Sequence, residues 1–189
     1  MALLTARRRR SRWQLALGAA LSLLACVFGA QAKVADYQVK AVFLFNFTQF
    51  VDWPPQSFAS AADPVVIGIL GDDPFGPYLD ETVHGEKIAQ RTLVVRRWHR
   101  VEEIDACHVL FVSRSEAGHL DEIVAALRGR SILTVGDDTA FLKRGGMVRF
   151  VNESDRVKVR INVDAARASG LTISSKLLRV AEIVEVGGE

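Results

Sequence analysis

The sequence is poor in cysteine, with Cys26 and Cys107 the only two among 189 residues. The segment that holds Cys26 reads as a removable export signal, as described below, so one cysteine remains in the mature chain. Such a chain has no internal disulfide, and packing must hold its fold. Cys107 opens a continuous apolar run and is interpreted as a small buried residue, with an intermolecular disulfide as the alternative.

Motifs that identify common enzymes are also missing. The sequence has no Gly-x-Ser-x-Gly element for a serine nucleophile, and the pair Gly71 and Gly76 lacks the lysine and hydroxyl of a phosphate-binding loop. The four histidines do not pair at the spacing of metal ligands. These absences predict a protein without catalytic activity, metal or cofactor. A zinc site assembled in space and an enzyme of unrecognised type stay open.

The first 32 residues have the composition of an export signal. Five arginines precede an apolar run from Leu15 to Phe28, and the sequence Ala30-Gln31-Ala32 offers a small-x-small cleavage site. We therefore predict a signal peptide over residues 1–32 and one mature domain over residues 33–189. Two alternatives stay open: a lipoprotein that carries its lipid on Cys26, and an uncleaved membrane anchor.

Removal of this segment changes the charge of the protein. The whole chain carries 24 basic and 22 acidic residues and has a sequence pI of 8.7. Residues 1–32 contain five arginines and no acidic residue, which leaves a net charge of −3 for the rest. The basic pI therefore belongs to the signal and does not indicate affinity for nucleic acid.

Strand-like and helix-like apolar segments alternate along the chain. We expect strands near residues 65–70, 92–98, 107–112 and 131–135, then a hairpin of 147–151 with 157–163 that has one wet face. We expect helices near residues 33–52, 74–83, 115–127 and 175–185, and a short one after Asp138. This order predicts an α/β fold of three layers, with a mostly parallel sheet, an antiparallel edge hairpin and flanking terminal helices.

Two acidic pairs follow expected strands: Asp72-Asp73 and Asp137-Asp138. The carboxyl ends of parallel strands meet at one edge of a sheet, where open α/β folds bind ligands. These loops, together with Ser113, are therefore candidate ligand loops whose carboxylates would suit Mg²⁺ or a phosphoryl group. The interpretation we favour is helix capping, with Asp73 as an N-cap before a proline in the first turn.

The expected helix of residues 33–52 is apolar around most of its circumference. Successive helical residues turn by about 100°, so its side chains cannot all face one sheet. Such a helix must be covered on most sides, by its own domain or by another chain. The residues that we predict for a dimer or partner surface are Phe43, Phe45, Phe47, Phe50 and Trp53.

Several of these segments together resemble the YfiR-like family of exported bacterial proteins. The resemblance rests on Lys40, Phe45-Asn46-Phe47, Phe50, Trp53-Pro54, Ile69-Leu70-Gly71-Asp72-Asp73-Pro74, the segment 107–113, Leu133-Thr134-Val135-Gly136-Asp137, Phe141, Gly145-Gly146-Met147, Arg160-Ile161-Asn162, Gly170-Leu171 and Ser174-Ser175-Lys176-Leu177-Leu178. These residues span nearly the whole mature chain in order.

The resemblance implies a Rossmann-like periplasmic domain that often forms a homodimer. It implies a repressor that docks on the periplasmic part of an inner-membrane diguanylate cyclase, and an outer-membrane lipoprotein that sequesters this repressor and so releases cyclic-di-GMP synthesis and biofilm formation. Some relatives carry paired cysteines, one of them near Cys107, and this chain lacks the partner, which puts redox control in doubt. A periplasmic small-ligand sensor that uses the loops after Leu70, Val112 and Val135 stays open as an alternative.

Overall fold

The computed structural model describes residues 35–154 and 156–185. The predicted signal peptide and Cys26 lie outside this part of the chain. By internal contacts the chain divides into Met1–Asp36 and Tyr37–Glu189, and the second unit is the one described below. Within the described residues, no helix has the length and apolar character needed to cross a membrane.

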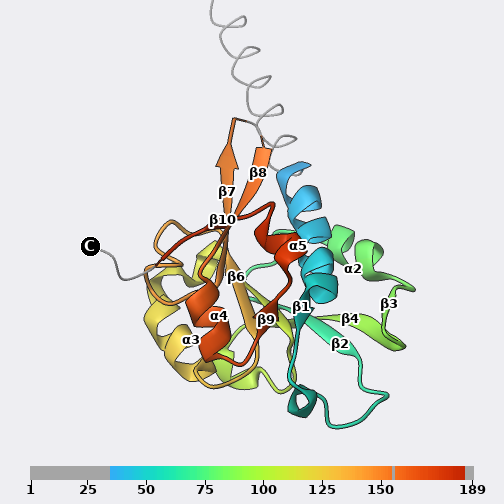
Figure 1. Ribbon diagram of the computed structural model, residues 1–189. Coiled ribbons are helices and arrows are strands. Elements are labelled where there is room, and N and C mark those ends of the chain that lie inside the picture. The colour runs from blue at the N-terminus through green and yellow to red at the C-terminus, as the bar shows by residue number, and fades with distance from the viewer. Residues whose placement is uncertain (1–34, 155, 186–189) are drawn as a thin grey trace, which may run out of the picture. The chain divides into compact units, whose positions relative to one another are not determined.

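An eight-stranded sheet forms the centre of the fold, with the strand order β10-β8-β7-β6-β5-β2-β4-β3 (Figure 1). The strands are β2 (Val65–Leu70), β3 (Lys87–Ile88), β4 (Arg91–Trp98), β5 (Val109–Val112), β6 (Leu133–Gly136), β7 (Val148–Glu153), β8 (Arg156–Ile161) and β10 (Glu182–Ile183). The five strands from β4 to β7 in this order run parallel, whereas β3 pairs antiparallel with β4 and β8 pairs antiparallel with β7. A separate antiparallel pair joins β1 (Val51–Asp52) to β9 (Thr172–Ile173).

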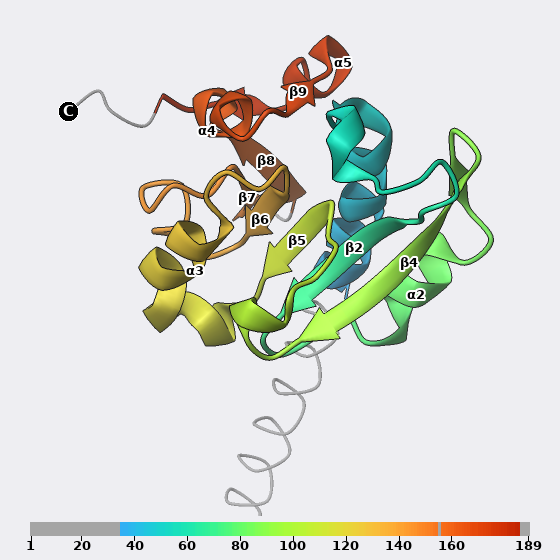
Figure 2. The same cartoon turned by 90° about the horizontal axis from the view of Figure 1, so that it is seen from below.

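Helices cover both faces of this sheet. They are the N-terminal helix, described from residue 35 to 50, and α2 (Pro77–Val83), α3 (Leu120–Leu127), α4 (Val163–Ala168) and α5 (Ser175–Leu178). The N-terminal helix, α2, α4 and α5 share one buried cluster with Ile67 and Phe111, and α3 shares the other with Leu110 and Val112. Figure 2 shows β5 and β2 between α3 on one side and the N-terminal helix and α2 on the other. The predicted three-layer α/β fold with a mostly parallel sheet is confirmed.

Strands with continuous apolar runs were predicted best. The first lies over Val65–Leu70 as expected, and β4 begins one residue before the expected range. In β8 the side chains of Val159 and Ile161 are buried while Lys158 is exposed. This alternation confirms that one face of the hairpin is exposed to solvent. A two-residue strand, β10, extends the sheet beyond this antiparallel pair by pairing parallel with β8.

The first and last residues of the helices differ more from the prediction than those of the strands. The N-terminal helix ends at residue 50 and not at 52, because Val51 and Asp52 pair with β9. Helix α2 begins at Pro77 and not at Pro74, and its N-cap is Gly76, whose φ of 55° favours glycine. The segment before α3 is a 3₁₀ helix, Arg114–His119, so the α-helix starts five residues after the expected Ser115.

The helix predicted after Asp138 is wrong, and the helix predicted over residues 175–185 is too long. Residues 139–145 form turns and not a helix, because Phe141 turns inward against the backbone of two glycines: a Cβ on Gly136 or Gly146 would lie 2.8 or 2.3 Å from its ring. The last helix, α5, ends at Leu178 and not at Glu185, since residues 182–183 add to the sheet as β10.

Candidate functional site

The loops after β2, β5 and β6 meet at the carboxyl edge of the sheet, as their parallel pairing requires. Because β2 is flanked by β4 and β5, the chain changes direction along the sheet at this point, where open α/β folds commonly bind ligands. Here the protein fills that position itself. The N–H of Asp72 donates to Ser115 Oγ at 3.0 Å, and a Cβ on Gly71 would meet this oxygen at 2.3 Å.

Asp137, which follows β6, is the centre of a buried polar cluster at this edge. Its Oδ2 accepts from Lys40 Nζ at 2.7 Å and from the Tyr37 hydroxyl at 2.9 Å, both on the N-terminal helix. Its Oδ1 accepts from Arg114 Nε at 3.0 Å. Lys40 and Asp137 are 3% exposed, and Lys40 Nζ also lies 4.2 Å from the centroid of the Tyr37 ring. We call these residues — Tyr37, Lys40, Arg114 and Asp137 — the Asp137 clasp.

Charge complementarity stabilises the ionised form of the Asp137 clasp. Burial alone would raise the pKa of Asp137, but the hydrogen bond and charge of Lys40, with Tyr37 and Arg114, outweigh burial and hold the pKa below its usual value. A buried carboxylate with three donors has little capacity left for a metal or substrate. The clasp therefore joins the N-terminal helix to the sheet, a role that the sequence did not reveal because Lys40 and Asp137 lie 97 residues apart.

The remaining acidic candidates hold local turns. Asp73 Oδ1 accepts from Phe75 N–H at 2.7 Å, and Asp138 Oδ1 accepts from Ala140 N–H at 2.8 Å, so the two acidic pairs share one turn geometry. The Ser113 N–H donates to the Leu70 carbonyl at 3.0 Å. The Asp73 and Asp138 contacts cap loops and not helices, whereas the Ser113 contact continues the backbone pairing of β2 with β5. A ligand role for Asp72, Asp73, Ser113, Asp137 and Asp138 stays a prediction.

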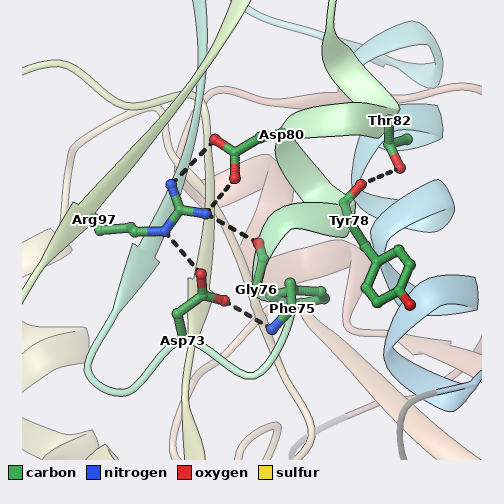
Figure 3. A network of polar contacts seen from close by, with 7 residues as sticks. All are labelled: Asp73, Phe75, Gly76, Tyr78, Asp80, Thr82 and Arg97. Carbon is green, nitrogen blue, oxygen red and sulfur yellow. Dashed lines mark hydrogen bonds and ion pairs between the residues drawn. The ribbon is translucent and has the colours of Figure 1, made fainter.

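Arg97 on β4 connects this edge to α2. Its guanidinium donates to Asp73 Oδ2 at 2.8 Å, to both oxygens of Asp80, and to the Gly76 carbonyl at 3.3 Å (Figure 3). The hydrogen bond to Asp80 is the main cause that raises the pKa of Arg97, so the guanidinium stays charged. This network fixes the start of α2 through residues far apart in sequence.

The aromatic residues predicted for a partner surface differ in burial. Phe47 is fully buried and stacks on Phe150 of β7, with ring centroids 6.0 Å apart. Phe43, Phe45, Phe50 and Trp53 are half-buried and pack against the same core. The domain therefore covers much of the helix itself, and a partner role for these five residues stays a prediction.

The uncovered side of the N-terminal helix presents two valines. Val39 and Val42 are 46% and 48% exposed, and they are three residues apart, so they share one face. Lys40 and Ala41, between them in sequence, point inward and are buried. The Asp137 clasp thus holds the helix in an orientation that leaves an apolar face in solvent.

Two observations bear on nucleophilic and metal chemistry in the described part of the chain. Cys107 is buried, as predicted, and burial raises the pKa of its thiol to about 12. Within residues 35–154 and 156–185, no three side chains of histidine, cysteine, aspartate or glutamate come together in a way that could hold a metal ion.

Comparisons with known proteins agree with the resemblance read from the sequence. The sequence model of the family described as YfiR/HmsC-like matches residues 37–182. Among curated proteins, no sequence matches this chain.

Two solved structures are similar to part of this chain. One is an ABC domain in complex with L-Trp from Streptococcus pneumonia (15% identity, TM-score 0.46), and the other is a conserved domain protein from Vibrio cholerae O1 biovar eltor (13% identity, TM-score 0.48). Each alignment covers 64% of this chain, which spans about half of the matched chains, 55% and 54% respectively.

Proposed function

Because the chain belongs to the YfiR/HmsC-like family, we propose that it binds the periplasmic part of an inner-membrane diguanylate cyclase and represses it. The family is one of periplasmic regulators of diguanylate cyclase signalling, and its members are regulatory and not catalytic. The family match extends over nearly all of the described residues, which supports the same role here. Repression would lower cyclic-di-GMP and biofilm formation.

The observation that carries a protein-binding role is the exposed apolar face of the N-terminal helix. A soluble domain gains stability by burying valine, yet Val39 and Val42 stay about half exposed on a helix whose other sides are packed. The Asp137 clasp joins this helix to the sheet through Tyr37 and Lys40, so the face is present without a partner. Preformed apolar surface with polar surroundings is typical of protein interfaces. The face is accordingly the proposed contact with the cyclase.

Two further partners belong to the proposal. An outer-membrane lipoprotein would sequester the repressor, and a second copy of the chain would form a homodimer. Half-buried Phe43, Phe45 and Phe50 border the exposed face on the same helix and would extend it into a larger interface. Because interfaces of stable complexes bury about 800 Å² per partner, two valines alone would not suffice.

The function is tested in cells that carry a cognate cyclase. Deletion of the gene should raise cyclic-di-GMP and surface attachment, and the wild-type gene should restore both. The variant Val42→Asp should fail to restore them, because a desolvated carboxylate opposes the contact. The matched control is Val180→Asp, which alters an exposed valine, 74% accessible, elsewhere on the chain. Unchanged cyclic-di-GMP after deletion would show that the protein does not repress that cyclase.

Export is a separate part of the proposal. Mass spectrometry of the protein from envelope fractions should give a chain that begins at or near Lys33. A chain that begins with a lipidated Cys26 would identify the protein as a lipoprotein, and a chain that retains the first 32 residues would support the uncleaved anchor.

A further inference from the structure

A hollow of about 530 Å³ lies at the opposite, amino edge of the sheet, where β2, β5 and β6 begin. Its polar lining consists chiefly of Ser57, Asp63, Arg96, Asp105, His108 and Arg130. The hollow has the size of small-molecule sites, which measure roughly 300–1,000 Å³. The apolar part of its lining includes Pro64, Val66 and Ile132.

His108 is the most informative residue of this lining. It is 2% exposed, and its Nδ1 accepts from the Val66 N–H at 3.0 Å. The neutral imidazole therefore carries its proton on Nε2. That atom is buried and, within the described residues, makes no hydrogen bond. A buried donor without an acceptor is costly, so its presence beside a hollow points to a ligand that supplies the acceptor.

The surroundings of His108 keep its ring neutral and in place. The ring stacks on Phe58, with centroids 4.4 Å apart, and meets the edge of Trp53 at 5.9 Å. Burial lowers the pKa of His108. An interaction with the backbone of Ser57 opposes this shift in part, although no hydrogen bond of normal geometry reaches Nε2. His108, which lines the hollow, therefore carries a buried N–H donor on Nε2 at neutral pH.

The other unmatched groups of the hollow can also donate hydrogen bonds. Ser57 Oγ is buried and, in the described part of the chain, has no hydrogen-bond partner. Arg130 donates from Nη2 to the carbonyls of Ile104 and Asp105, at 2.9 Å each, and its remaining N–H groups have no acceptor among the described residues.

The carboxylates of the lining, in contrast, are already satisfied. Asp63 accepts from the N–H and the hydroxyl of Ser60, at 2.8 and 2.7 Å. Asp105 accepts from Arg96 through both oxygens at 2.9 Å. The surplus of the hollow is therefore in donors, and a molecule that complements it must supply acceptors.

We propose that this hollow binds a small organic carboxylate. Its oxygens accept from His108 Nε2–H and the Ser57 hydroxyl, close to the Arg130 guanidinium, and its apolar body lies on Val66 and Ile132. The site differs from the loops after the strands, and it does not depend on the proposed repression of a cyclase. It is linked to the segment that follows the N-terminal helix, because Trp53 Nε1 donates to the His108 carbonyl at 3.2 Å.

The test uses benzoate as the probe carboxylate and benzamide as its uncharged counterpart. Protein purified after expression of the full chain is titrated with each by calorimetry, and the His108 ring is followed by ¹⁵N NMR. Benzoate should saturate a single site and shift the Nε2 resonance, and benzamide should bind at least about tenfold more weakly, since it offers one acceptor and no charge.

Variants locate the binding within the hollow. Ser57→Ala and His108→Asn should each weaken benzoate about tenfold or more, because each removes one donor to a charged group. His108→Asn retains an oxygen that can accept from the Val66 N–H, and circular dichroism checks its folding; if it does not fold, Ser57→Ala decides. Arg156→Gln, at an exposed arginine outside the hollow, should bind as wild type does.

Three results would overturn the proposal. They are the absence of saturable benzoate binding to the wild-type protein, unchanged affinity in folded Ser57→Ala or His108→Asn protein, and NMR shifts that map to the loops of Asp72 and Asp137.

Discussion

The two edges of the parallel sheet are built in opposite ways. At the carboxyl edge, Asp137 is surrounded by Tyr37, Lys40 and Arg114, and each of its two side-chain oxygens has a donor. At the amino edge, His108 Nε2 and Ser57 Oγ are buried without partners in the described structure, beside a hollow. The edge where α/β folds usually bind ligands is thus closed, and the edge where they usually do not is open.

This contrast shows why topology alone cannot locate a site. A strand order that reverses at β2 brings loops together, but whether a ligand fits depends on which side chains fill the space. Here the N-terminal helix supplies Lys40 to one edge, and the residue Trp53, just after it, contacts the other. Residues 37–53 therefore contribute contacts to both edges.

The largest loss of stability is expected when the Asp137 clasp at the closed edge is removed. Asp137→Ala leaves the Lys40 ammonium buried without its carboxylate, which should cost about 3–5 kcal/mol of the free energy of unfolding in urea. Ser57→Ala at the open edge should cost less than about 1 kcal/mol, because its hydroxyl has no partner to lose.

A double variant separates charge from packing at the closed edge. Lys40→Met combined with Asp137→Leu should recover much of the loss, since an apolar pair of similar volume avoids the unpaired charge. A cost below about 1 kcal/mol for Asp137→Ala alone would show that the Asp137 clasp does not hold the helix.

The next comparison is between a fully buried and a half-buried phenylalanine on the N-terminal helix. Phe47→Ala should cost about 3–5 kcal/mol, because Phe47 is fully buried against Phe150. Phe45→Ala should cost clearly less, because its side chain is half-buried, and it should weaken self-association or partner binding if this face is an interface. Urea unfolding and light scattering measure the two effects. Equal unfolding costs with unchanged association would assign both residues to the core.

Acid should destabilise the two edges in separate pH windows. The folded pKa of His108 is lowered, so the unfolded chain takes up a proton first, and stability falls as the pH drops below about 6.5, the ordinary value for histidine. The folded pKa of Asp137 is also lowered, so its stabilisation persists above about pH 3.9 and is lost below it.

Variants assign these windows. Measured as urea midpoints against pH, the decrease that begins near about pH 6.5 should shrink in His108→Asn, and the decrease below about pH 4 should shrink in Asp137→Asn. A pH profile of His108→Asn that matches wild type would mean that other groups cause the first decrease.

The smallest effect is expected at the surface of the closed edge. Arg97→Gln removes the contacts to Asp73 and Asp80, but the arginine side chain is 39% exposed, and exposed ion pairs contribute about 0–1 kcal/mol. The urea unfolding midpoint should shift only slightly. The part of its salt dependence that comes from these ion pairs should be lost. A loss comparable to that of Asp137→Ala would mean that these exposed ion pairs contribute far more than about 1 kcal/mol.

Sequence patterns predicted the elements whose positions depend on the local order of apolar residues. The buried strand Val65–Leu70 was found to the residue, because a continuous apolar run needs no information from distant residues, whereas β5 and β6 each begin two residues later than expected. The start of α2 was misplaced, since Gly76 and the distant Arg97 determine it. Lys40 in an apolar helix was a signal of a buried partner, but nothing local identified Asp137.

The open edge was missed for a similar reason. His108 follows Cys107 in an apolar run, which predicts a buried side chain and gives no sign of an unpaired nitrogen. The Val66 N–H on β2, 42 residues earlier, occupies Nδ1 and so places the ring proton on Nε2. Pairings of this kind become visible only when the strands are aligned in space.

Direct binding to the cyclase tests the proposed function most directly. The purified protein is passed over the immobilised periplasmic part of a cognate diguanylate cyclase, as wild type, Val42→Asp and Val180→Asp. We expect saturable binding of the wild type and of Val180→Asp, and binding at least about tenfold weaker for Val42→Asp, because the carboxylate would be buried against an apolar partner. No binding of the wild-type protein, or equal binding of all three, would contradict the assignment of the N-terminal helix as the repressing surface.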